Sequence, residues 1–361
     1  DLVYLRKWTI IGIIIGTLSG FLVIIGFEAV RIFSSFFLSD IVRYIQPYPE
    51  DVASLSSDYS LYVLKPWLIP ATLGLIGLLI GILSTKLSTA IGKNGIDEIS
   101  DEFHNKKNQF SLKISSLKLF SSILAIGSGT SGGVEDSLAN TGSTLASIIG
   151  KLFKLNQEEI RIAIAAGMGS AIGGILRLPF GGAVFSLELL YRRDFIIKSL
   201  YPAFLASITS YIISGIVLDW PSFLYIPHEF ITKTSFLSIG AYGLIAAMIG
   251  LIGIGYVRTV QTFQKHFEDM KIPLYLKPAL GGAIIGIFAI GFPEILGTGY
   301  GWLQVAALGN HQIFPLWIMF PVIIMKIFAT SVSHGSRNST GLLGPSPVSY
   351  THLTLPTTSR V

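Results

Sequence analysis

The chain has no cysteine and few charged residues. Without cysteine, disulfide bonds and thiolate metal sites are excluded. Only 13% of the 361 residues are charged and 51% are hydrophobic, whereas soluble domains average about 25% charged residues. The net charge is a modest +5 and lies between apolar runs, which is typical of membrane topology rather than of nucleic-acid binding. We therefore predict an integral membrane protein that binds no nucleic acid, and we expect neither a cofactor nor a metal site.

Four uncharged runs come close to the roughly 20 residues that a membrane-spanning helix needs. They cover residues 8–27, 67–85, 199–218 and 234–257. Lys and Arg are absent from the connecting stretches 44–62 and 219–231 but gather in 86–118, 192–198 and 258–277. Positively charged loops stay on the cytoplasmic side. We therefore predict a multi-pass protein of the cell membrane with a cytoplasmic N-terminus.

Four other apolar runs are too short to cross a membrane unaided. They cover residues 119–134, 137–150, 162–176 and 178–187. Such broken segments are tolerated at membrane depth only where they are buried in protein or line a cavity. They are therefore the best indication in a sequence of a transport site.

The first two of these runs meet at a glycine-rich stretch, residues 127–137. We expect the second run to be a helix that begins here, because Asp136 and Ser137 are residue types favoured at an N-cap. The free N–H groups and partial positive charge of such an end suit an anion. Glu135 lies at the same end, where its side chain would fill the anion site when ionised and vacate it when protonated. We therefore predict that Glu135 is a gate.

An internal repeat divides the chain. The pattern Gly-Ser-x-x-Ser-x-Gly at 127–133 recurs at 335–341, and Pro-Ala-x-x-Gly at 70–74 recurs at 278–282. Both offsets are 208 residues (335 − 127 and 278 − 70). The charge pattern places the start of the first Pro segment outside and that of the second inside, as in inverted-topology repeats. We predict an all-α polytopic fold of two such repeats with broken, tilted helices, residues 1–218 and 219–346.

Several motifs together resemble the CLC family of chloride channels and proton-coupled chloride transporters. Residues 133–137, Gly-Val-Glu-Asp-Ser, resemble its Gly-x-Glu-Gly-Pro element. Residues 178–188 resemble its Pro-hydrophobic-Gly-Gly run that ends in Glu, and 335–346 its Gly-Ser-x-x-Ser-Gly-Gly element. Residues 297–301 also fit, and 92–98 match the position of its anion-binding loop. By the order and spacing of these motifs the chain is identified as a prokaryotic-like member.

The resemblance implies chloride transport across the lipid bilayer, not enzymatic activity. It implies a pore at the N-termini of broken helices, gated by Glu135, and a homodimer with one pore per subunit. Carried over by position, the anion-binding residues are Asn94, Gly133, Val134, Gly341, Leu342 and Leu343. Chloride, fluoride and nitrate remain open as substrates.

The sequence departs from the family pattern at several of these positions. Asn94 stands in place of the anion-coordinating Ser, and Asp136 and Ser137 replace Gly-Pro after the gating Glu. Leu343 replaces the usual Phe. The family's last helices have no counterpart, so we expect the second repeat to be incomplete. We expect the Thr-rich tail, 347–361, to be a non-native, adapter-derived segment.

The channel and antiporter alternatives differ at one position. Leu189 lies where proton-coupled members carry an inner Glu, and it cannot hold a proton. Glu188 precedes it, but one residue turns a helix side chain by about 100°. There it can pair with Arg192 at i,i+4. We therefore favour an uncoupled channel; the alternative is a proton-coupled chloride antiporter with Glu188 as the proton relay.

Two readings from other classes remain. The string Gly-Thr-Ser-Gly at 129–132 is compatible with an intramembrane serine protease that uses Ser131 with a histidine base, His104 or His334. A transporter of larger organic anions would need an additional Arg or aromatic cluster, and the sequence shows none.

Overall fold

The protein is described here by a computed structural model that covers residues 2–48, 65–87, 95–105, 110–191, 197–218, 236–308 and 316–342. Within these residues the regular secondary structure is helical, apart from one isolated β-bridge. The α-helices are α1 (Leu2–Ser34), α2 (Leu68–Lys86), α3 (Gly95–Asn105), α4 (Leu112–Gly127), α5 (Glu135–Leu152), α6 (Gln157–Ile175), α7 (Pro179–Tyr191), α8 (Leu200–Leu218), α9 (Phe236–Asp269), α10 (Lys277–Gly291), α11 (Tyr300–Ala307) and α12 (Leu316–Gly335). A π-helix, Ser35–Val42, continues α1.

Among the described residues, six helical segments are long and apolar enough to span a membrane. They are Leu2–Val42, Leu68–Lys86, Ile197–Leu218, Tyr242–Asp269, Leu274–Gly291 and Trp317–Gly335. The predicted short runs are also helices, α4 to α7, and they measure only 13 to 19 residues. The prediction of an all-α polytopic protein with broken helices is thus confirmed.

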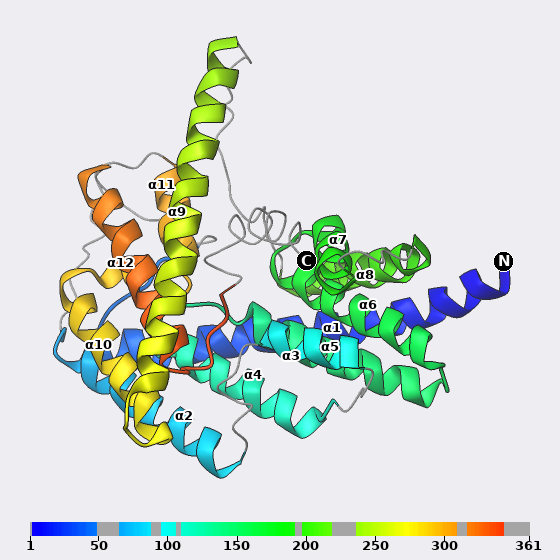
Figure 1. Cartoon of the computed structure of the whole chain (residues 1–361), viewed down its shortest axis with the longest axis horizontal. Helices are drawn as coiled ribbons and strands as arrows, with labels where there is room; N and C mark the ends of the chain where they lie inside the picture. The colour runs from blue at the N-terminus through cyan, green and yellow to red at the C-terminus, as the bar shows by residue number, and fades with distance from the viewer. Residues whose placement is uncertain are drawn as a thin grey trace.

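Helix α6 is the centre of the first half of the chain, surrounded by α1, α5, α7 and α8 (Figure 1). Small residues let these helices approach closely: a Cβ at Gly167 of α6 would meet Ala146 of α5, and one at Gly16 of α1 would overlap α8. The Ser170 hydroxyl donates to that of Ser19, 2.7 Å away, and so joins α6 to α1. This half is therefore a tightly packed bundle around a helix that is buried on most of its surface.

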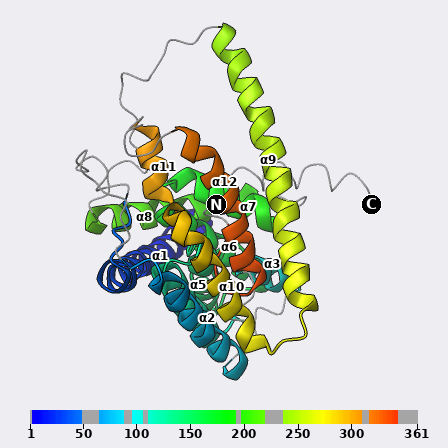
Figure 2. The same cartoon turned by 90° about the vertical axis from the view of Figure 1, so that its left-hand side faces the viewer.

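Helices α2 and α10, which carry the repeated Pro-Ala-x-x-Gly pattern, lie side by side (Figures 1 and 2). Their contact is reciprocal. A Cβ at Gly77 of α2 would overlap the backbone of Pro278, and one at Gly286 of α10 would overlap that of Pro70. Equivalent segments of the two repeats thus pack against one another, with α12 beside α10 and α9 beside α12.

Several element boundaries differ from the prediction, among them those of α1 and α5. A helix was expected over 8–27, but α1 has 33 residues. It continues past the uncharged run because the charged side chains beyond that run stay at the helix surface. One of them is Arg31, whose guanidinium lies 6.0 Å from the centre of the Tyr48 ring. The N-cap of α5 is Val134, with no side-chain cap, so the expectation of a cap at Asp136 or Ser137 was wrong. Backbone pairing across the repeats fixes the residues before α5, and the Asp136 carboxylate bonds elsewhere.

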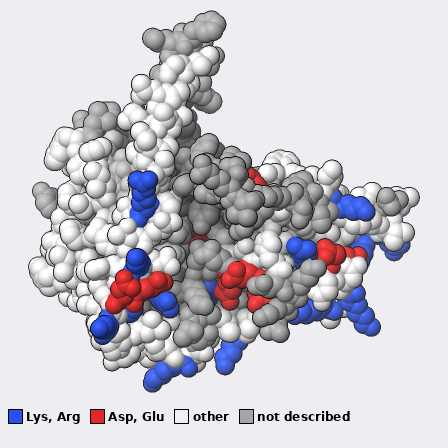
Figure 3. Space-filling view, in the orientation of Figure 1, with Lys and Arg blue, Asp and Glu red and all other residues white. Residues whose placement is uncertain are grey.

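Positive charge is unevenly distributed over the surface. In Figure 3, Lys and Arg gather along the lower and right-hand edges of the view. The N-terminal half of α9, at the top, carries no charged side chain. The uncharged stretch agrees with the sequence, in which residues 236–257 contain no Asp, Glu, Lys or Arg.

Candidate functional site

The glycine-rich loop between α4 and α5 is fully buried. Gly129 and Gly132 have φ angles of 105° and 153°, a region that favours glycine. A Cβ at Gly132 would also meet the Thr340 side chain. The loop is therefore glycine-rich for two reasons: its backbone conformation, and the close approach of the second repeat.

Backbone hydrogen bonds tie this loop to two segments of the second repeat. The Gly133 N–H donates to the Gly341 carbonyl over 3.2 Å, and the Gly341 N–H donates to the Gly133 carbonyl over 2.8 Å. The Gly297 N–H donates to the Gly129 carbonyl over 2.9 Å. The N-terminus of α5 therefore lies where the two repeats meet.

Glu135, the first residue of α5, holds a buried carboxylate at this junction. Its side chain is 1% exposed. The Tyr300 hydroxyl, at the start of α11, donates to Oε1 over 2.8 Å, while Oε2 has no hydrogen-bond partner among the described residues. A Cβ at Gly133 would overlap Oε2, so the carboxylate folds back over that glycine. An acid rests here against the end of a helix that favours negative charge.

A second buried carboxylate follows at once. Asp136 is 3% exposed, and its Oδ2 accepts a hydrogen bond from the Leu342 N–H over 3.2 Å. A Cβ at Gly341 would come within 2.7 Å of Asp136 Cγ. Glycine at 341 thus makes room for the Asp136 side chain.

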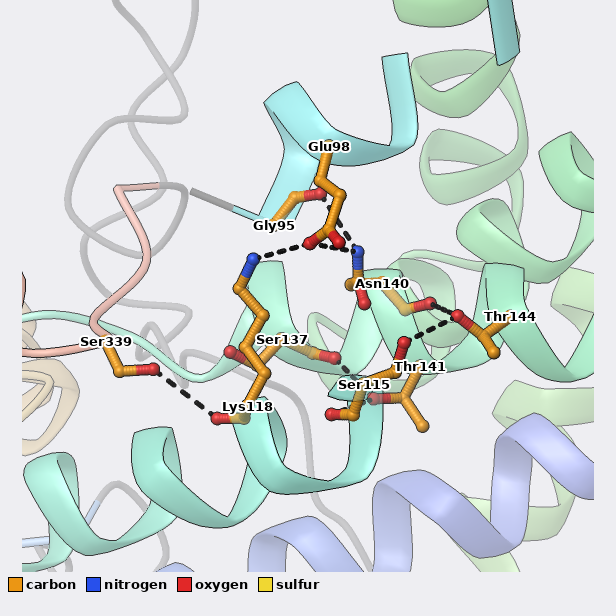
Figure 4. Close-up of polar contacts among 9 residues, drawn as sticks. All are labelled: Gly95, Glu98, Ser115, Lys118, Ser137, Asn140, Thr141, Thr144 and Ser339. Carbon is orange, nitrogen blue, oxygen red and sulfur yellow. Dashed lines mark hydrogen bonds and ion pairs between the residues drawn. The ribbon is translucent and has the colours of Figure 1, made fainter. Parts of the chain in front are cut away.

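An ion pair lies beside α5 (Figure 4). Lys118 Nζ is 2.8 Å from Glu98 Oε2, and the Asn140 amide donates to the same oxygen and to the Gly95 carbonyl, over 3.3 Å each. The Ser339 hydroxyl donates to the Lys118 carbonyl. Lys118 is 1% exposed and lies inside α4, so it is a buried helical residue and not a loop charge. The pair joins α3, α4 and α5 next to the junction.

Lys326, in the middle of α12, is a second lysine in an apolar setting. Its ammonium donates to the carbonyls of Ile295 and Gly297, over 2.9 and 2.6 Å. Gly297 in turn contacts the loop before Glu135, and the segment leads into Tyr300. Lys326 thus holds the turn that delivers the Tyr300 hydroxyl.

The structure brings most of the predicted site together. Gly133, Val134 and Glu135 lie beside Gly341 and Leu342. The N–H groups of Gly133 and Gly341 donate to each other's carbonyls, and the Leu342 N–H donates to Asp136. The predicted anion-binding residues Asn94 and Leu343 lie outside the described residues.

The predicted proton relay, Glu188, belongs to α7 and not to the helix ends that meet at Glu135. Glu188, on α7, is exposed, whereas Leu189 packs against the core of the first half. The two side chains therefore face different surroundings, as the helical turn of about 100° requires. Arg192, the expected partner of Glu188, lies outside the described residues.

Ser131, the nucleophile in the alternative hypothesis of a serine protease, contacts a residue other than histidine. The Ser131 hydroxyl lies 3.0 Å from that of Thr330, so among the described residues its contact is a threonine rather than a histidine. The His104 ring bonds to the Ser100 carbonyl at the end of α3. Among the described residues Ser131 thus has no histidine in hydrogen-bond contact to act as a general base.

Four contributors were missed in the sequence: Tyr300, Lys326, the contact of Asp136 and the Lys118–Glu98 ion pair. Tyr300 belongs to the Gly-Thr-Gly-Tyr-Gly motif, which indicated a site but not a partner for its hydroxyl. Lys326 interrupts an apolar run, a pattern that marks functional residues in membranes and was a usable signal. No group of three or more His, Asp or Glu that would hold a metal occurs in the described part of the chain.

Comparison with known proteins identifies the family to which the sequence is similar. A family model described as voltage gated chloride channel matches residues 76–348. A putative chloride channel protein, ClcB-like, of Ralstonia nicotianae is 25% identical over 291 residues, 78% of this chain and 65% of that protein. An uncharacterized protein of Methanocaldococcus jannaschii is 25% identical over 259 residues, 70% of this chain and 62% of that protein. The chain thus spans somewhat less than two thirds of the length of these relatives.

Solved structures share the fold. A slow cyanobacterial Cl⁻/H⁺ antiporter superposes with a TM-score of 0.75 and 17% identity, over 97% of this chain and 81% of that one. A CLC-type fluoride/proton antiporter gives a TM-score of 0.76 and 17% identity, over 94% and 78%. At this identity the likeness concerns the fold alone. With the family model covering well over half of the residues, the chain belongs to the voltage-gated chloride channel, or CLC, family.

Proposed function

We propose that the protein moves chloride across the cell membrane through a pathway that passes the N-terminus of α5. One observation carries this proposal: the buried carboxylate of Glu135 lies at a helix N-terminus, where the two repeats meet. An ionisable residue at membrane depth is costly, by about 2.5–3.5 kcal/mol on insertion scales, and is a functional candidate by default.

The binding chemistry is that of backbone amides. N–H groups at broken-helix ends replace the hydration shell of an ion and favour negative charge. Val134 and Leu342 are the predicted anion-binding residues whose amides flank the Gly133–Gly341 pairing. Asn94 and Leu343 remain predictions from position.

Glu135 acts in this proposal as a gate. Its ionised carboxylate occupies the space that an anion would take, held by the Tyr300 hydroxyl. Protonation removes its negative charge and its attraction to the helix end. Chloride then takes its place.

We favour an uncoupled channel over a proton-coupled antiporter. Coupling needs a second proton-carrying group toward the cytoplasmic side, and Leu189 at that position is apolar and packed against the core. Glu188 is exposed and faces another surface. A proton-coupled antiporter that uses Glu188 remains the alternative.

The test is chloride efflux from liposomes that contain the full-length protein. We expect selective chloride flux, and a reversal potential that does not move when a proton gradient is applied at fixed chloride. Absence of chloride flux from protein that elutes as a folded species would contradict the transport proposal. A reversal potential that follows the proton gradient, and loses this in Glu188→Gln, would establish the antiporter instead.

Assembly and orientation are proposed on the family pattern and the charge distribution. We infer a homodimer, a cytoplasmic N-terminus, and repeats that divide near residue 218. Cross-linking in membranes that yields monomer alone would contradict the dimer. Labelling of an N-terminal tag from the outside of intact cells would contradict the orientation.

A further inference from the structure

We propose that Asp136 is a second tethered carboxylate, which competes with the transported anion for the backbone N–H of Leu342. This inference rests on the proposed function, because it concerns the same pathway. It gives the site two acids, both from the first turn of α5, with different hydrogen-bond donors in the second repeat.

The contact itself carries the proposal. Asp136 is buried, and its Oδ2 lies 3.2 Å from the Leu342 amide nitrogen, which donates to it. Leu342 is a predicted anion-binding residue of the second repeat. Asp136 belongs to α5 of the first repeat, so its carboxylate reaches across the junction to the amide that an anion would use.

The two carboxylates divide the junction between them. Glu135 turns back over Gly133 of its own repeat and accepts from Tyr300, whereas Asp136 turns toward Gly341 and Leu342. The absence of a side chain at each glycine leaves the room that the facing acid fills. Each carboxylate thus occupies its own space beside a glycine, Glu135 at Gly133 and Asp136 at Gly341.

An acid in the first turn stabilises a helix whatever its function. That explanation accounts for the presence of Asp136 in α5 but not for its contact with the amide of the other repeat. The family pattern that the chain resembles has glycine at this position, so the carboxylate is a departure from that pattern.

The Asp136 carboxylate weakens anion binding by two physical effects. The carboxylate occupies a donor that the anion needs, and hydrogen bonds to charged groups are stronger than neutral ones. Its negative charge also repels an anion nearby in a medium of low dielectric constant. Removing Asp136 therefore strengthens anion binding and lowers the chloride concentration at which flux saturates.

The test compares Asp136→Asn and Asp136→Gly with the unmodified full-length protein in liposomes. Both variants remove the charge. Asn keeps the shape of the side chain and a weaker hydrogen-bond acceptor, whereas Gly removes the acceptor as well. We expect the half-saturating chloride concentration of flux to fall at least about tenfold in Asp136→Gly and less in Asp136→Asn. Asp101→Asn makes the same charge change at an exposed position of α3 and serves as the control, with no change expected.

Chloride affinity of the purified proteins, measured by titration calorimetry, gives a second readout that does not need flux. If Asp136→Gly fails to fold, the result for Asp136→Asn alone tests the inference, because Asn is nearly isosteric with Asp. Unchanged or weaker chloride binding in folded Asp136→Asn would overturn the inference. If the unmodified protein transports chloride in that case, the proposed function stands; if no variant transports or binds chloride, both fail.

Discussion

Gly133 and Gly341 exchange two backbone hydrogen bonds although they lie 208 residues apart. That separation (341 − 133) is the offset of the sequence repeat, so each glycine is paired with its own counterpart. The pairing forms the isolated β-bridge of the described structure and joins the start of α5 to the segment after α12. The two halves thus meet at equivalent points, with the candidate gate, Glu135, two residues from one of them.

We predict that Glu135→Gln makes chloride flux insensitive to external pH. An amide cannot ionise, so it neither fills the site at high pH nor leaves it at low pH. The measurement is liposome flux over a series of external pH values, with Glu158→Gln as the control, because Glu158 is 59% exposed on α6. An unchanged pH profile in Glu135→Gln would place the gate elsewhere.

Gly133→Ala should raise chloride flux at neutral pH. The added Cβ overlaps Glu135 Oε2 and displaces the carboxylate from its seat. Gly215→Ala is the matched control, since a Cβ there meets nothing within 4 Å. In a Glu135→Ala background the same Gly133→Ala change should have no further effect, because the two changes act through one contact. A loss of flux of equal size in both backgrounds would show that the methyl group obstructs the pathway instead.

Tyr300→Phe should also raise flux at neutral pH, by about tenfold or more. The hydroxyl donates to Glu135 Oε1 over 2.8 Å, and a hydrogen bond to a charged group contributes about 1.5–3 kcal/mol. Without it the carboxylate leaves its seat more often. Tyr242→Phe, at an exposed position of α9, should leave flux unchanged. Equal flux in Tyr300→Phe and the unmodified protein would mean that the hydroxyl does not hold the gate.

The Lys118–Glu98 ion pair predicts an asymmetry in stability. Glu98→Gln leaves the fully buried ammonium of Lys118 without its carboxylate and should destabilise the protein by about 3–5 kcal/mol. Lys118→Met should cost less, because the side chain of Glu98 is 30% exposed and reaches water. The double variant should be more stable than Glu98→Gln alone. Thermal unfolding in detergent measures all three, and equal midpoints for the two single variants would contradict the assignment.

Much of the fold was predictable because it follows from local patterns. Four of the six candidate spans overlap the long uncharged runs of the sequence, and the 208-residue offset identified 127–133 and 335–341 as equivalent segments, though not the pairing between them. The start of α5 was not predicted well. N-cap preference favoured Asp136 and Ser137, but a tertiary contact recruited the Asp136 side chain and shifted the helix start to Glu135.

The residues that complete the site escaped prediction for a related reason. Lys118 and Glu98 are 20 positions apart, and Tyr300 and Glu135 are 165 apart. No periodic pattern encodes such pairs, because they depend on how helices cross. Lys118 in particular reads as a loop charge in sequence, since its neighbours Lys113 and Lys107 are also basic.

The contact of α2 with α10 also constrains how the protein is made. The backbone at Pro278 and Tyr275 closes over Gly77 and Gly81 of α2, but α10 begins 191 residues after α2 ends (277 − 86). At translation rates of about 5–20 residues per second, α2 waits about 10–40 s for its partner. During that interval its glycine face is covered only by lipid or by the insertion machinery. A ribosome that stalls between the two helices leaves this face open, and we expect such chains to be removed by membrane quality-control proteases.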